Sequence, residues 1–111
     1  MVKAAEVTVT IRAAERRRSI RESAAYPAVI ADRHGRFIAR GRTANISEQG
    51  AFVLADAQSL KLQQVVLVEL SLPSLKRPDA RRVVTYACRI ARRQQIGQLV
   101  GVGVEFLQKI G

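Results

Sequence analysis

The sequence predicts an all-β fold, a six-stranded antiparallel β-barrel preceded by a basic arm. Apolar and polar residues alternate with a period of two in several short segments, which is typical of strands with one buried face. Turn-forming residues separate these segments. The length of 111 residues and the 48% hydrophobic content suit one compact core. An antiparallel barrel closes such a set of strands without leaving exposed edges.

The first segment is interpreted as an arm, residues 1–23. Val7, Val9 and Ile11 alternate with threonines, and charges then accumulate from Arg12 to Glu22. Periodicity over so few residues does not distinguish a short strand from a helical turn. We therefore expect two parts, an arm over residues 1–23 and a barrel over residues 24–111.

The strands of the barrel follow in order. The first two are predicted on either side of His34 and Gly35, a pair suited to a hairpin turn because glycine accepts positive φ. The six predicted strands cover residues 26–32, 36–44, 51–55, 65–72, 81–92 and 99–107. Pro73, Ser74, Pro78 and Asp79 mark a turn before the fifth strand, and Gly97 marks one before the sixth.

Alternation within the last three strands identifies the core. The side chains expected to point inward are Val66, Val68, Leu70, Leu72, Val84, Tyr86, Cys88, Ile90, Val100, Val102, Val104 and Phe106. Gly101 and Gly103 fall on the opposite face, where glycines mark a bend or a close approach of backbone of the kind that a barrel wall needs.

The charge indicates an anionic partner. The formal net charge is +10, and fifteen of the 19 basic residues are arginine. Arginine offers a planar fork of donors that matches phosphate oxygens or the O6/N7 edge of guanine.

The composition disfavours an enzyme or a metalloprotein. His34 lies in a predicted turn and Cys88 on an inward face, so neither is expected to act as base or nucleophile. One His and one Cys do not make a metal-ligand set, and we expect no cofactor. A single Cys forms no internal disulfide, and no N-terminal apolar stretch predicts a signal peptide or membrane span. We therefore expect a cytoplasmic protein.

Two short segments carry a resemblance to a known family. The first reads RRRSIR from Arg16 to Arg21, and the second reads NISEQG over residues 45–50. They resemble the signature motifs of the bacterial PilZ family, RxxxR and [D/N]xSxxG. The matching residues are Arg17 and Arg21 in the first motif, and Asn45, Ser47 and Gly50 in the second. The resemblance covers residues 16–107.

The two motifs differ in specificity. Pairs of arginines four residues apart recur at Arg12/Arg16, Arg36/Arg40, Arg77/Arg81 and Arg89/Arg93. Composition predicts on the order of 0.01 accidental matches to the second motif, so the second motif is the informative one.

The resemblance implies a receptor for cyclic di-GMP rather than an enzyme. Arg17 and Arg21 are then expected to form forked bonds to phosphate or to the O6/N7 edge of guanine. Arg16, just before this motif, is expected to reach a second phosphate or a second, stacked ligand molecule. Asn45 and Ser47 are expected to meet other guanine groups or to support the arginines, and Gly50 to permit positive φ or close approach of the ligand. The family also implies an unidentified protein effector in motility, exopolysaccharide synthesis or biofilm formation.

Other interpretations stay open. A basic β-barrel that binds RNA or DNA fits the charge but has few aromatic residues for stacking. A degenerate PilZ-like interaction module is a second alternative. The basic arm and the Asn-x-Ser turn are also typical of a solvated segment and a locally capped loop. Arg36, Arg40 and Arg42 are expected to form an exposed polar face that steers anions.

Overall fold

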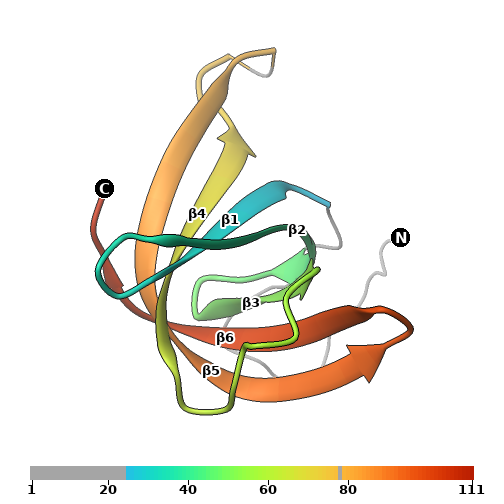
Figure 1. Ribbon diagram of the computed structural model, residues 1–111. Coiled ribbons are helices and arrows are strands. Elements are labelled where there is room, and N and C mark those ends of the chain that lie inside the picture. The colour runs from blue at the N-terminus through green and yellow to red at the C-terminus, as the bar shows by residue number, and fades with distance from the viewer. Residues whose placement is uncertain (1–24, 78) are drawn as a thin grey trace, which may run out of the picture.

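The computed structural model describes residues 25–77 and 79–111 as a closed antiparallel β-barrel (Figure 1). Hydrogen-bonded neighbours follow the order β1-β2-β3-β6-β5-β4 around the barrel. The strands are β1 (Pro27–Asp32), β2 (Phe37–Ile46), β3 (Gly50–Ala55), β4 (Val65–Pro73), β5 (Arg81–Ile96) and β6 (Leu99–Lys109). The predicted fold class, strand number and strand order along the chain are confirmed.

The last two strands are longer than the sequence predicted. β5 continues past Arg92 to Ile96, because Gln94, Gln95 and Ile96 remain paired with the start of β6. Gly97 has a φ of 61° and turns the chain directly into β6. β6 then runs to Lys109, so the C-terminal residues extend the barrel wall. Both faces of this hairpin are exposed to solvent beyond the barrel, so its sequence is polar on both faces. It therefore lacks the alternation of apolar and polar residues from which a strand is predicted.

The core lies inside the barrel and has the inward faces that alternation predicted. The predicted residues of β4, and those of β5 and β6 apart from Tyr86 and Phe106, are buried. Tyr86 and Phe106 are half-buried and stack on each other, with ring centroids 4.0 Å apart. Leu60, from the connection between β3 and β4, is also fully buried in this core. The pattern of strands did not reveal this contribution from a loop.

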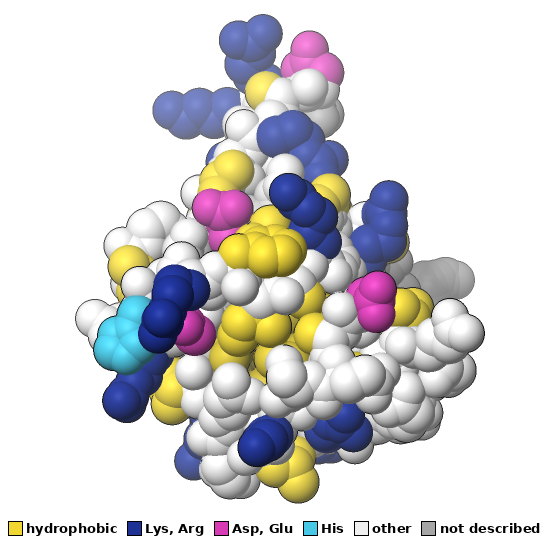
Figure 2. All heavy atoms as spheres, viewed as in Figure 1, with side chains coloured by type: hydrophobic (Ala, Val, Ile, Leu, Met, Phe, Trp, Pro, Cys, Tyr) yellow, Lys and Arg dark blue, Asp and Glu magenta, His cyan; other side chains and the backbone are white. Residues whose placement is uncertain are grey.

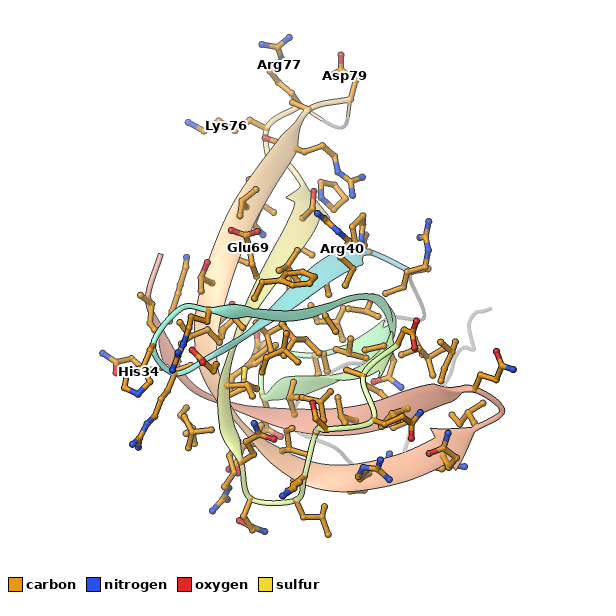
Figure 3. The ribbon with its side chains drawn as sticks, in the orientation of Figure 1. His34, Arg40, Glu69, Lys76, Arg77 and Asp79 are labelled. Atoms are coloured by element: carbon orange, nitrogen blue, oxygen red, sulfur yellow. The ribbon has the colours of Figure 1, made fainter. Side chains whose placement is uncertain are left out.

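The β1–β2 hairpin turns at Gly35, as predicted, with a φ of 88°. Asp32 organises this turn, because its Oδ1 accepts hydrogen bonds from the backbone N–H groups of His34 and Arg36 at 2.8 and 2.9 Å. The bond from Arg36 N–H is the main reason that the pKa of Asp32 lies below its usual value. His34 is exposed at the turn, which agrees with a structural role there (Figure 3).

The β4–β5 hairpin projects away from the rest of the barrel (Figure 1). Lys76, Arg77 and Asp79 lie at its tip, where they point into solvent (Figure 3). Arg81 ties the two strands together near the tip, since its Nη2 donates to the carbonyl oxygen of Ser71 at 2.9 Å. In the described part of the chain, no helix is present that is long and apolar enough to cross a bilayer. The predicted arm, residues 1–23, lies outside the described residues.

Candidate functional site

The second sequence motif forms the tight connection from β2 to β3. The N–H of Ser47 donates to the carbonyl oxygen of Gly50 at 2.8 Å. The hydroxyl of Ser47 accepts a hydrogen bond from the N–H of Gln49 at 3.2 Å. The carbonyl oxygen of Gln49 in turn accepts the N–H of Phe106, which attaches the turn to β6. Ser47 therefore caps the loop locally, a role typical of serine in turns.

A β-bulge in β2 sets the direction of Asn45. Thr43 pairs with Val53 and Asn45 pairs with Phe52, so Ala44 is the extra residue of the bulge. Thr43 is buried inside the barrel, and regular alternation would also point Asn45 inward. The bulge instead places Asn45 on the outer face, while Ile46 packs against the core. No hydrogen bond ties the Asn45 side chain to another residue in the described ranges, so its amide is available to a ligand.

Gly50 has a structural role that differs from the expected positive φ. Its φ is not in the left-handed region, where among glycines only Gly35 and Gly97 lie in the described chain. A Cβ on Gly50 would come within 2.1 Å of the carbonyl oxygen of Val104. Glycine is required here because the backbones of β3 and β6 approach each other closely. The expectation of positive φ was wrong, and the expected approach of a ligand stays a prediction.

The structure adds three residues to this face that sequence reasoning did not assign to the site. Asn45 pairs with Phe52, Phe52 with Gly103, and Gly103 with Arg92, in one row across β2, β3, β6 and β5. A second bulge, at Ala91, turns Arg92 outward, since alternation from Cys88 and Ile90 would point it inward. We call these four residues, Asn45, Phe52, Gly103 and Arg92, the motif row.

The aromatic ring of Phe52 lies at the centre of the motif row, and the guanidinium of Arg92 lies over it. Phe52 lies against Gly101, where a Cβ would come within 2.4 Å of the ring carbon Cζ. The guanidinium carbon of Arg92 lies 5.4 Å from the centroid of the same ring, a cation–π arrangement. The nearest neighbours of Gly101 and Gly103 are the side chains of Phe52 and Arg92 rather than another backbone, which differs from the expected close approach of backbone. Gly101 and Gly103 were the one sequence signal for the position of the Phe52 ring, because a strand face without side chains leaves room for a large neighbouring side chain.

Charges extend along the same face. Glu105 pairs with Gly50 across β3 and β6 and forms a salt bridge with Arg89 on β5. Arg92 has no carboxylate partner among the described residues and is exposed where it lies over the Phe52 ring. No group of three His, Cys, Asp or Glu side chains that would hold a metal ion occurs within residues 25–77 and 79–111. The face therefore offers an amide, an aromatic surface and a guanidinium.

Comparison with known proteins identifies the family. The PilZ domain matches residues 15–110, which is nearly the whole chain. The chain belongs to the PilZ domain family. No curated protein matches the chain. The family match includes the positions of Arg17 and Arg21, which match the first motif, and of Arg16 just before it, but these residues lie outside the described part of the structure.

The arginines of β2 form the exposed surface that was expected. Arg36, Arg40 and Arg42 of the PilZ domain are all exposed. Arg36 lies just before the strand and contacts the Asp32 carboxylate at 3.1 Å, whereas Arg40 lies over the ring of Phe37. These contacts of Arg36 and Arg40 are with neighbours on their own hairpin.

Cys88 of the PilZ domain is buried in the barrel, as predicted, and burial raises the pKa of its thiol to about 12. We expect Ellman's reagent to leave the folded protein unmodified at neutral pH and to modify it fully in denaturant. Burial favours the neutral thiol, so the pKa of Cys88 is higher in the folded protein than the ordinary 9.0. The contribution of the neutral thiol to folding stability is therefore complete below pH 9 and is lost as pH rises toward 12.

The control for this prediction is Cys88→Ala, which lacks the titrating thiol. Urea unfolding at a series of pH values should show the stability advantage of the native protein over Cys88→Ala shrinking above pH 9. Fast modification of the folded protein at neutral pH would contradict the burial of the thiol.

Proposed function

We propose that this PilZ domain is a receptor for cyclic di-GMP that signals to a partner protein. PilZ domains as a family are cyclic di-GMP receptors and act as binding and adaptor modules. The observation that most supports the proposal in this chain is the outward direction of Asn45. Among the described residues its amide has no hydrogen-bonding partner, and it lies beside Phe52, over whose ring Arg92 lies, next to the Ser47–Gly50 turn.

The chemistry of this face suits the ligand. Cyclic di-GMP carries two phosphates and two guanines, so its receptor needs cations, hydrogen-bonding groups and flat apolar surface. Asn45 supplies an amide for a guanine edge, and Phe52 supplies the apolar surface. Arg92 supplies a guanidinium whose fork fits a phosphate or the O6/N7 edge of guanine.

The first motif supplies the remaining cations in this proposal. Arg16, Arg17 and Arg21 approach the motif row and form forked bonds to phosphate or guanine. Each charge-assisted hydrogen bond contributes about 1.5 to 3 kcal/mol, which offsets the entropy of ordering the arm. The arm then changes the surface that the domain offers to its effector. We place this receptor in the bacterial cytoplasm and expect the effector in motility, exopolysaccharide synthesis or biofilm formation.

Isothermal titration calorimetry with cyclic di-GMP tests the function directly. We expect saturable binding, which Arg21→Ala weakens by about tenfold or more, a loss of about 1.4 kcal/mol. The matched control is Arg77→Ala. Arg77 also belongs to a pair of arginines four residues apart, and its substitution removes the same charge as Arg21→Ala. Arg77 lies at the tip of the β4–β5 hairpin (Figure 3). Equal weakening by the two variants would show that net charge alone drives binding.

The same titration distinguishes the motif row from a nucleic-acid surface. Asn45→Ala should weaken cyclic di-GMP binding, while GTP and a short single-stranded RNA should not compete with the ligand. Salt-sensitive RNA binding without cyclic di-GMP binding would favour the nucleic-acid alternative. No binding of any of these ligands would favour the degenerate interaction module.

A further inference from the structure

A second face of the barrel carries a continuous row of apolar side chains. Phe37 on β2 pairs with Ala31 on β1, Ala31 with Leu67 on β4, and Leu67 with Ala87 on β5. Their neighbours Ile30, Val66 and Cys88 are buried, so alternation places the row on the outside of the barrel. We call Phe37, Ala31, Leu67 and Ala87 the Phe37 row.

Phe37 is the exposed member of this row, and Ala31, Leu67 and Ala87 are half-buried beside it. The side chain of Phe37 is 61% exposed, and Val65 on β4, beside Leu67, is also exposed. Val29, adjacent on β1, is half-buried and adds to the same surface. Single exposed apolar residues are common, but a contiguous group across four strands marks an interaction surface. An exposed aromatic ring with an arginine beside it is the composition that protein interfaces favour.

The charged side chains around the Phe37 row indicate the sign of the charge that a partner would carry. Arg40 lies over the Phe37 ring, with its guanidinium carbon 5.6 Å from the centroid. Arg40 pairs with Val29, and Val29 with Glu69, so the parallel row contains one cation and one carboxylate (Figure 3). Arg42 follows on β2 and is exposed. Figure 2 shows hydrophobic side chains on this face with both basic and acidic side chains around them.

Charge also disfavours a second copy of the chain on this surface. Self-association would bring Arg40 and Arg42 of two copies together in a chain with a net charge of +10. Like charges at an interface oppose association unless they are paired. An acidic partner gains from the same arginines.

The dimensions of the row fit a helix. Four neighbouring strands about 4.8 Å apart give a row of about 14 Å. An apolar stripe at positions i, i+3, i+4 and i+7 of a helix extends about 10.5 Å, at 1.5 Å per residue. A helix laid across the strands would therefore contact most of the row with one stripe and direct its acidic side chains toward Arg40 and Arg42.

We propose that the Phe37 row is the docking surface for an acidic amphipathic helix of a partner protein. The row uses β1, β4 and the early parts of β2 and β5, whereas the motif row uses β3, β6 and the later parts of β2 and β5. The two surfaces are thus different, and docking at the Phe37 row does not depend on the ligand proposed above.

A designed peptide tests this surface with the full chain. The probe is a helical peptide with leucines at i, i+3, i+4 and i+7 and glutamates on its other face. The two comparison peptides replace the glutamates by lysines or the leucines by serines. In two-dimensional NMR of the ¹⁵N-labelled protein, we expect the Leu/Glu peptide to shift the amides of residues 29–31, 37–40, 65–69 and 83–87 saturably. Both comparison peptides should bind at least tenfold more weakly.

Matched variants locate the effect. Phe37→Asp should weaken binding of the Leu/Glu peptide by tenfold or more. Leu75→Asp, at an 86% exposed position in the β4–β5 connection, makes a similar change and should not alter binding. The far-ultraviolet circular dichroism of both variants checks the fold. Four results would overturn the proposal: no binding, shifts confined to other strands, equal binding of a comparison peptide, or self-association that Phe37→Asp abolishes.

Discussion

Gly50→Ala is expected to destabilise the barrel by about 3 kcal/mol, because overpacking against backbone is poorly relieved. The new Cβ would come within 2.1 Å of the carbonyl oxygen of Val104 and 3.2 Å of its carbonyl carbon. Neither atom belongs to a flexible side chain, so β3 and β6 would have to separate. Six residue pairs join these strands, from Gly50–Glu105 to Ala55–Val100, and separation weakens that ladder.

Urea unfolding measures this effect, and Gly111→Ala is the matched control. A Cβ on Gly111 meets no atom within 4 Å, and the residue does not have positive φ. That control should change stability by less than about 0.5 kcal/mol. If Gly50→Ala were as stable as the native protein but did not bind cyclic di-GMP, glycine at this position would be required for contact with the ligand and not for the packing of β3 against β6.

Leu60→Ala is expected to cost about 2 to 5 kcal/mol of stability, the range for large-to-small changes in a core. Leu60 has no exposed surface and fills the barrel from the β3–β4 connection. Its carbonyl oxygen accepts a hydrogen bond from Nε of Arg93 at 2.7 Å, and Nη2 of Arg93 also reaches the carbonyl oxygen of Gln58. These bonds fix the connection, so it has little freedom to collapse into the cavity left by the substitution.

Leu62→Ala provides the control for this cavity. Leu62 lies two residues further along the same connection and is 55% exposed. Its truncation should change the urea midpoint little, since it removes few buried contacts. Similar losses for Leu60→Ala and Leu62→Ala would show that the connection does not contribute to the core in the way described here.

The sequence predicted the strands because their signals are local. Alternation in β4 identified Val66, Val68 and Leu70 as core residues, and the barrel buries all three completely. The turn at Gly35 followed from the ability of glycine to adopt positive φ. The C-terminal end of β5 and the burial of Leu60 were missed, since a polar hairpin and a buried loop residue carry no periodic signal.

The candidate site was predicted only in part. The motif at residues 45–50 identified the β2–β3 turn, but alternation alone would have directed Asn45 into the core. Bulges at Ala44 and Ala91 reverse that direction for Asn45 and Arg92. A bulge depends on register with the partner strand, so one strand's sequence does not specify it.

The sequence by itself determined the family, the all-β class, the inward faces and the motif residues, because each rests on neighbours along the chain. The tertiary structure decided which side chains share a surface. It aligned Asn45, Phe52, Gly103 and Arg92 across four strands, and it joined Phe37 to Leu67 on a different face. Strand order, register and bulges set these rows, and all three arise from contacts between residues far apart in sequence.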